Sequence, residues 1–167
     1  PAHLLQRWHP RAMTARRTAS ETAAVPPPIS EELRAHFAPL LRGTLMERCG
    51  IELLTLDARG GTASMPVEGN VQPAGLLHGG ATIALAETIA SFAAIVQARE
   101  VHGEGAQAVG TSVSALHHRS ARQGSVTATC SARHLGRQVA SYLVDVHDEA
   151  GTLLSTVTVA TQLLPPR

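Results

Sequence analysis

The sequence contains no lysine, and aromatic side chains make up only 2% of its 167 residues. All 14 basic residues are arginines, and 13 acids balance them to a formal net charge of +1, so no broad electrostatic field is expected. Binding of single-stranded nucleic acid relies on basic grooves and aromatic stacking, for which this composition offers little. We therefore expect no nucleic-acid partner.

Cysteine is also scarce. Cys49 and Cys130 lie far apart, and neither belongs to a pair with zinc-ligand spacing, so the sequence predicts neither a disulfide framework nor a metal site. Free thiols fit a reducing, cytoplasmic location. The longest apolar stretch, residues 81–98, is interrupted by Glu87, Ser91 and Gln97, which favours a buried core helix over a membrane span. We expect no contact with a membrane.

The first 28 residues differ from the rest of the chain. Four arginines precede the first acid, Glu21, and Pro26, Pro27 and Pro28 follow, a composition typical of a tail or linker. Hydrophobic residues make up 44% of the whole chain, which is enough for one core of this length. The sequence predicts a disordered or extended tail over residues 1–28 and one domain over residues 29–167.

The start of the domain predicts a short helix followed by a hairpin. Ser30 is a plausible N-cap, apolar residues follow at helical spacing, and Gly50 is a plausible end. Two extended runs, residues 51–56 and 62–67, surround a glycine-rich turn, which is the pattern of a β-hairpin.

The rest of the domain predicts one long helix and more antiparallel strands. Residues 79–99 are apolar nearly all round, so this helix must be buried on most faces. Turn residues at hairpin spacing separate further strands near residues 108–118, 124–134, 138–148 and 152–164. The predicted fold class is α+β, with an antiparallel sheet of about five or six strands wrapped around one long central helix.

Glu87 stands in the middle of this apolar helix. An unpaired carboxylate in apolar surroundings costs several kcal/mol, so its position needs an explanation. Two interpretations stay open from the pattern alone: the helix turns Glu87 toward solvent or an arginine, or the carboxylate is kept for chemistry.

The helix opens with His78, Gly79 and Gly80. Unpaired N–H groups and the positive end of the helix dipole suit an oxygen that gains negative charge. The same three residue types occur in the oxyanion loop of α/β-hydrolases, but no Gly-x-Ser-x-Gly is present and the chain is short for that fold. The sequence therefore disfavours a serine hydrolase.

Longer runs around these residues resemble a known family, the hotdog-fold acyl-CoA thioesterases of the phenylacetate-degradation type. The resemblance rests on Gln72-Pro73-Ala74-Gly75-Leu76-Leu77-His78-Gly79-Gly80 and Leu85-Ala86-Glu87-Thr88, and it continues at residues 109–110, 117–124, 134–137 and 148–151. It covers about residues 40–164. Within the family, the sequence is most similar to thioesterases that act on hydroxybenzoyl-CoA and dihydroxynaphthoyl-CoA.

The resemblance implies a role for each matching position. Glu87 matches the essential carboxylate, and Gln72 and the Gly79 amide match the groups that polarise the thioester carbonyl. His78 and Ser91 match further catalytic positions. Contact with the acyl group, pantetheine or CoA is implied for Gly80, Thr88, His117, Arg119, His134, Gly136 and Arg137. CoA is part of the substrate, and no metal or other cofactor is implied.

Several of these residues also have a purely structural interpretation. His78 could satisfy a backbone group where the loop meets the helix, and Ser91 could simply pack against a strand. His118, which alternates with His117 across the pleat, fits a surface position on a strand. Arg122 and Arg137 fit solvated turns. The sequence leaves these alternatives open.

The spacing of Gly79 and Glu87 argues for more than one subunit. Eight residues along a straight helix at ~1.5 Å each place them about 12 Å apart, too far to act on one thioester carbon. A homodimer in which Gln72 and Gly79 of one subunit face Glu87 of the other removes the conflict, and the resemblance implies such a dimer, together with a dimer of dimers (a homotetramer). Two sites per dimer follow from the symmetry.

The sequence thus predicts an acyl-CoA thioesterase, with an aromatic acyl group favoured and Glu87 acting as a base or as a nucleophile. Two other classes stay open. A hotdog hydratase would fit the fold, although its signatures, a His in a proline-rich loop or an Asp-x-Asn-Pro-x-His run, are absent. A non-catalytic acyl-CoA binding protein would need no acid at Glu87.

Overall fold

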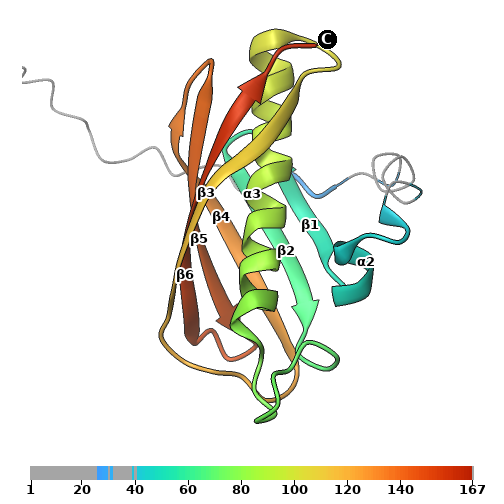
Figure 1. Ribbon diagram of the computed structural model, residues 1–167, viewed down its shortest axis with the longest axis vertical. Coiled ribbons are helices and arrows are strands. Elements are labelled where there is room, and N and C mark those ends of the chain that lie inside the picture. Colours follow the sequence, from blue (N-terminus) through green and yellow to red (C-terminus); the bar gives the residue numbers. More distant parts are fainter. Residues whose placement is uncertain (1–25, 30, 32–38, 40, 167) are drawn as a thin grey trace, which may run out of the picture.

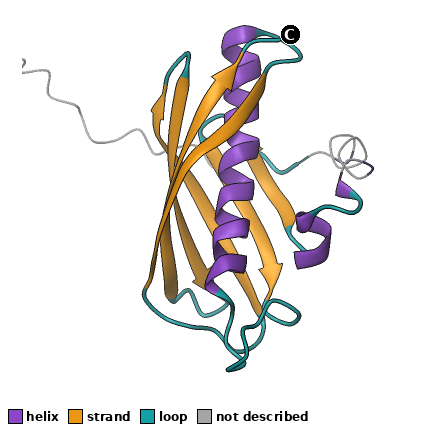
Figure 2. Cartoon of the chain, viewed as in Figure 1, coloured by secondary structure: helices purple, strands orange, loops and turns teal. Residues whose placement is uncertain are grey.

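The computed structural model describes residues 26–29, 31, 39 and 41–166 of the chain. Six strands form one antiparallel sheet in the order β1-β2-β4-β5-β6-β3, and the long helix α3 lies across one face of it (Figures 1 and 2). The named elements are α2 (Leu45–Cys49), β1 (Glu52–Asp57), β2 (Gly60–Pro66), α3 (Gly79–His102), β3 (Gln107–His117), β4 (Ser125–Leu135), β5 (Val139–Asp148) and β6 (Leu153–Leu164). The predicted α+β hotdog architecture is confirmed.

Short turns join β1 to β2, β4 to β5, and β5 to β6. In the β1–β2 turn, Gly60 has a φ of 141°, and a Cβ there would overlap the Cys130 carbonyl of β4, so only glycine fits. In the β5–β6 turn, Asp148 Oδ1 accepts hydrogen bonds from the backbone N–H of Thr152 at 2.8 Å and of Ala150 at 3.0 Å. These bonds, that of Thr152 foremost, hold the pKa of the Asp148 carboxyl below its ordinary value.

One side of α3 forms the core with the inner face of the sheet. Its fully buried residues include Leu85, Ile89 and five alanines, and the alanines let the strands approach closely. By length and composition alone α3 could cross a membrane, a test that core helices of globular proteins also pass. Its contacts with all six strands account for its apolar composition.

The other side of α3 is less covered than the sequence suggests. Ile83, Glu87, Ser91 and Ile95 follow one another at four-residue spacing, and all four are only half-buried. Four-residue spacing keeps side chains on one face of a helix. We call these four residues the open stripe of α3.

The two edge strands of the sheet, β1 and β3, differ in whether another segment pairs with their outer edge. Residues 26–29 lie along the outer edge of β1, where the Leu56 N–H donates to Pro27 O and the Ile29 N–H to Leu54 O, both at 3.1 Å. Thus Pro26 to Pro28, which the sequence assigned to the tail, lie alongside β1. The outer edge of β3 is paired with no segment among the described residues.

Part of the helix expected from Ser30 to Gly50, residues 30, 32–38 and 40, lies outside the described residues, and the last part, which is described, is not continuous. Gly43 has a φ of 72°, and Thr44 starts the separate helix α2 as its N-cap. The Thr44 hydroxyl donates to Leu41 O at 2.5 Å and accepts from the Glu47 N–H at 3.5 Å. Glycine and threonine together interrupt the helical pattern, and α2 ends at Gly50 as predicted.

Candidate active site

The loop between β2 and α3 is held by a buried amide. The Asn70 side chain donates to Cys49 O at 2.8 Å and to Pro66 O at 2.9 Å, and the Asn70 carbonyl accepts from the His78 N–H at 2.8 Å. Through these three hydrogen bonds, Asn70 connects the last residues of α2 and β2 to His78, the residue that precedes α3. Buried polar groups with several partners make a loop rigid.

Gln72 lies within this loop with its side-chain oxygen already in use. Its Oε1 accepts a hydrogen bond from the Ala74 N–H at 2.8 Å, and its backbone closes a tight turn with Gly75 and Leu76. The bond from a backbone N–H identifies the side-chain atom as the oxygen, so the amide NH₂ is left as a donor. Gln72 can therefore donate to a carbonyl oxygen without leaving its loop.

His78 is the N-cap of α3. Its Nδ1 accepts a hydrogen bond from the Gly80 N–H at 2.8 Å, which satisfies one of the free donors of the first turn. Within the described residues, the Gly79 N–H has no acceptor. Gly79, and not Gly80, therefore offers a backbone donor at the start of the helix.

Gln72 and Gly79 line one cavity of about 200 Å³, together with His117 and Arg119. His117 Nδ1 is 2.8 Å from the hydroxyl of buried Ser155 on β6, and its Nε2 lies beside the Gly79 backbone, 2.8 Å from the place of a Cβ. Arg119 Nη1 donates to Leu153 O at 3.2 Å. Four of the residues predicted for the site thus meet at this cavity.

Glu87 does not line this cavity. Its carboxylate forms no hydrogen bond or ion pair within the described part of the chain, so the arginine partner considered from the sequence is not present there. Its Oε1 lies against β3, 2.9 Å from where a Cβ on Gly110 would stand. Thr88 and Ser91 are half-buried near it, one residue and one turn further along α3.

Gly79 and Glu87 lie on one α-helix, which runs from Gly79 to His102 without a break. The estimate of about 12 Å between their positions therefore holds for this chain. The donors at the cavity and the carboxylate are separate within one chain, as the sequence argument expected.

His134, Gly136 and Arg137 lie at the other end of the molecule. With His102 they line a cavity of about 590 Å³ beside the β4–β5 turn. Gln97 Nε2 donates to Gly136 O at 3.2 Å, and the His102 ring lies 2.5 Å from Arg137 O, so the turn is fastened to the end of α3. This end is about 35 Å from Gly79 along the helix, so the three residues do not join the others within one chain.

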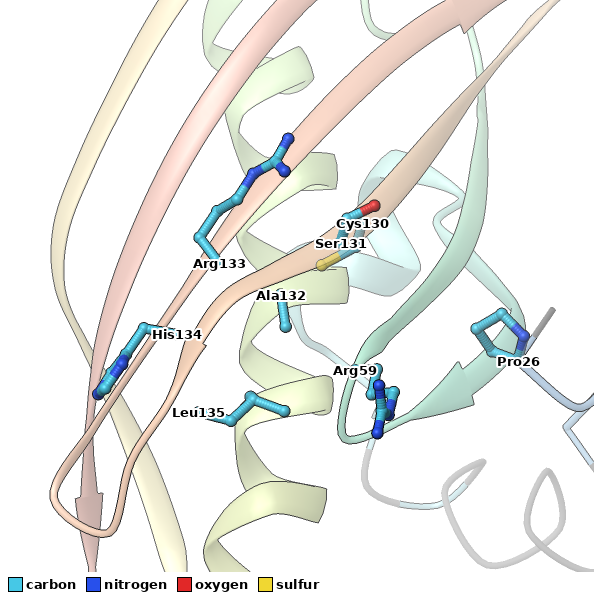
Figure 3. A pocket seen from close by; sticks show the side chains of 8 residues that line it. All are labelled: Pro26, Arg59, Cys130, Ser131, Ala132, Arg133, His134 and Leu135. Carbon is cyan, nitrogen blue, oxygen red and sulfur yellow. The ribbon is translucent and has the colours of Figure 1, made fainter. Parts of the chain in front are cut away.

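A further cavity of about 320 Å³ lies beside the β1–β2 turn, and Figure 3 shows its lining. It holds Arg59, Cys130, Arg133 and His134, and the three basic side chains point in different directions (Figure 3). No carboxylate lines it, and burial raises the pKa of the Cys130 thiol to about 12, which keeps the sulfur protonated and unreactive at neutral pH. This cavity is not the candidate active site.

Two residues at the candidate site received no role from the sequence, although Gly110 lies in one of the runs that carry the resemblance. Ser155 holds the His117 ring, and Gly110 leaves space for the Glu87 carboxylate. A glycine inside a strand pattern is a known sign of a close approach, so Gly110 could have been found from its position. Nothing in the sequence marks Ser155, because its pairing with His117 depends on the β3–β6 register.

Comparisons with known proteins show which family the chain belongs to. The family model of the thioesterase superfamily matches residues 74–155. The proofreading thioesterase EntH of Cronobacter turicensis is 42% identical over 123 residues, which cover 73% of this chain and 87% of that protein. EntH of Klebsiella pneumoniae is 41% identical over 122 residues, which cover 72% of this chain and 86% of that protein.

Solved structures give the same result. The thioesterase HI1161 of Haemophilus influenzae has a TM-score of 0.69 and 32% identity, over 76% of this chain and 87% of that one. A mutant of the thioesterase PA1618 of Pseudomonas aeruginosa has a TM-score of 0.71 and 31% identity, over 78% and 93%. The chain therefore belongs to the thioesterase superfamily, and it is a hotdog-fold thioester hydrolase with acyl-CoA as the substrate that the family implies.

Proposed function

We propose that this thioesterase hydrolyses an aromatic acyl-CoA at a site shared by two subunits, with Glu87 of one subunit facing Gln72 and Gly79 of the other. One observation carries the proposal. The free donors of Gln72 and Gly79 line one cavity, whereas Glu87, which has no partner among the described residues, lies about 12 Å away along the same helix.

The chemistry follows from these groups. The Gly79 N–H and the Gln72 NH₂ bind the thioester oxygen and stabilise the negative charge that develops on it. Glu87 either takes a proton from water, whose oxygen adds to the carbonyl carbon, or adds to that carbon itself and forms a mixed anhydride that water then cleaves. In both routes the C–S bond breaks and the sulfur leaves as the CoA thiol. These protein groups suffice without a metal or further cofactor.

The sheet edges support the dimer. Prolines cannot donate to a strand, and Pro26 to Pro28 cover the outer edge of β1. The outer edge of β3 has neither proline nor charged side chains, and it exposes Val109 and Leu116. An open edge of eleven residues without such protection is a template for pairing with a second copy.

Contacts between α3 and β3 suggest one register for this pairing. Glu87 lies over Gly110, and Gly79 lies beside His117. The midpoint of Gly79 and Glu87 on the helix is Ile83, on the open stripe, and the midpoint of Gly110 and His117 on the strand falls between Val113 and Ser114. A two-fold axis that passes outside the open edge of the sheet, level with these midpoints, brings each Glu87 opposite the partner's Gly79, and the helix and the strand give the same level.

A relative supports the two side chains. Structures of SAV0944 of Staphylococcus aureus have a glutamine and, separately, a glutamate replaced by alanine. These two residues stand fifteen positions apart in that protein, as Gln72 and Glu87 do here. The aromatic preference rests on the similarity of the motif to aromatic-acyl thioesterases. The dimer of dimers and the cytoplasmic location stay predictions.

The test is the release of free thiol from a panel of benzoyl-, hydroxybenzoyl-, hexanoyl- and acetyl-CoA. The parent should release thiol with the highest kcat/KM for the aromatic substrates, and Glu87→Gln should lose several orders of magnitude in kcat. Glu100→Gln, which changes an exposed acid at the end of α3, is the matched control and should keep full activity.

Each part of the proposal can fail separately. Full activity in Glu87→Gln would refute the role of the carboxylate. Equal or better hydrolysis of hexanoyl-CoA would refute the aromatic preference. A change in an acyl double bond without thiol release would indicate a hydratase, and binding without turnover would indicate a non-catalytic acyl-CoA binding protein.

A further inference from the structure

Gly110 is an unexpected residue at its position. It lies in the interior of β3 and pairs with Thr161 of β6. Glycine is unfavourable inside a strand, since it loses much conformational freedom and packs no side chain. The φ of Gly110 is not in the positive region, so the backbone conformation does not require a glycine. Another cause must keep a side chain away.

That cause is the carboxylate of Glu87. Among the described residues outside its chain neighbours, a Cβ at Gly110 would meet only this group, with Oε1 at 2.9 Å and Cδ at 4.0 Å. Real Cβ atoms essentially never stand so close to another atom, so the carboxylate, which is the far end of a flexible side chain, has to shift its position to make room. We propose that Gly110 is a positioning residue, whose missing side chain admits the Glu87 carboxylate to the open edge of the sheet.

The strand is also irregular at this point. The pairing of β3 with β6 shifts by one residue between Gly110 and Ser112, which leaves Thr111 as the extra residue of a β-bulge. The Thr111 hydroxyl donates to Ala160 O at 3.1 Å, which fastens the bulge to β6. Bulges bend a strand and often occur beside active sites. Gly110 and the bulge at Thr111 together shape the stretch of β3 backbone against which the Glu87 carboxylate lies.

A similar close approach occurs at Gly79, but here the glycine lies on the helix and the side chain comes from the strand. There a Cβ on the helix would stand 2.8 Å from Nε2 of His117, a side chain of the strand. The φ of Gly79 is not positive either. The helix and the edge strand thus approach each other at two glycines, and each glycine accepts a polar side chain from the other element. At Gly79 and at Gly110, the missing side chain of the glycine leaves space for a polar side chain of the proposed site.

The inference rests on the proposed catalytic role of Glu87 and adds which residue positions its carboxylate. A methyl group at residue 110 must displace the carboxylate, and a displacement of about 1 Å can cost roughly 100-fold in rate. Gly110→Ala should therefore lower kcat about 100-fold and leave KM within a few-fold, because the carbonyl-binding donors are untouched.

A double-mutant cycle tests the contact without relying on activity. The urea midpoint is measured for the parent, Gly110→Ala, Glu87→Ala and the double variant. Because the carboxylate must shift to make room for the methyl group, Gly110→Ala should change the midpoint less favourably when Glu87 is present than in the Glu87→Ala background. Ser131→Ala, an exposed position on β4, is the matched control and should act additively with Glu87→Ala.

The outcomes separate this inference from the proposed function. Equal effects of Gly110→Ala in both backgrounds, or full kcat in Gly110→Ala, would overturn the positioning role. Coupling in the cycle together with full activity of Glu87→Gln would instead refute the catalytic role of Glu87 and leave the contact with Gly110 in place.

Discussion

His78 Nδ1 accepts the hydrogen bond of the Gly80 N–H at 2.8 Å, and this contact decides which amide at the start of α3 can bind substrate. The Gly80 donor is in use, and the Gly79 donor next to it has no acceptor among the described residues. Of the two interpretations that the sequence left for His78, the geometry supports a cap of the helix. In the proposed mechanism, the imidazole caps the helix and leaves the Gly79 N–H for the substrate.

We expect His78→Asn to keep most of the activity, because asparagine is among the best N-cap residues and its side-chain oxygen can accept from the first turn. His78→Ala should lose about 1 kcal/mol of unfolding free energy and part of kcat, since the Gly80 N–H is freed and the turn loosens. Urea unfolding and thiol release measure both. A stable but inactive His78→Asn would show that the imidazole itself acts on the substrate.

Gln72→Glu should separate the two ends of the Gln72 side chain. A glutamate still accepts from the Ala74 N–H, so the loop and the unfolding free energy should stay close to those of the parent. It has no NH₂ to donate to the thioester oxygen, and the loss of one such donor typically costs about 100- to 1000-fold in kcat. Activity near the parent level would mean that the Gln72 amide does not bind the carbonyl.

Much of the fold was predictable, because its signals are local. Alternating apolar residues and turn glycines predicted β4, β5 and β6 to within about two residues, and the apolar run from Gly79 predicted α3. The strand order was not predictable in the same way. β3 follows α3 in the chain but pairs with β6, about forty residues later. The periodicity of a sequence does not predict pairing between segments so far apart.

The candidate site was also predictable only in part from the sequence. Gln72, His78, Gly79 and Glu87 form a recognisable pattern in the sequence, and the helix rise alone separates Gly79 from Glu87. The contacts of His117 with Gly79 and of Glu87 with Gly110 require the crossing of α3 and β3. They became visible only when the two elements were placed together.

The unfolding free energy should fall at alkaline pH because of Cys130. Burial, and then the charge of Asp57, raise the pKa of this thiol from 9.0 to about 12 in the folded chain. Below pH 9 the thiol is protonated in both states and has no effect. Between pH 9 and 12 only the unfolded chain releases this proton, so stability falls with rising pH by up to about 1.4 kcal/mol for each unit.

Urea unfolding between pH 8 and pH 11 measures this slope. Cys130→Ala should be less stable at pH 8, because it leaves a cavity, but its slope above pH 9 should be smaller than that of the parent. Cys49→Ala changes the other, half-buried cysteine and is the matched control for the loss of a thiol. An equal slope in Cys130→Ala would assign the alkaline loss to another group, such as buried Tyr142, whose pKa is also raised by burial.

A shared site makes a prediction about mixtures of two inactive variants. Glu87→Gln subunits keep Gln72, and Gln72→Ala subunits keep Glu87, so a dimer of one each holds one intact site and one site with both changes. Random pairing makes half of the dimers mixed, each with one of two sites intact, and should restore about a quarter of the parent activity. Coexpression with two different tags allows the mixed dimer to be isolated, and it should then show half of the parent kcat. Sites built within one chain would show no recovery, since every chain in the mixture lacks one of the two groups, and the unmixed variants carried through the same procedure provide the baseline.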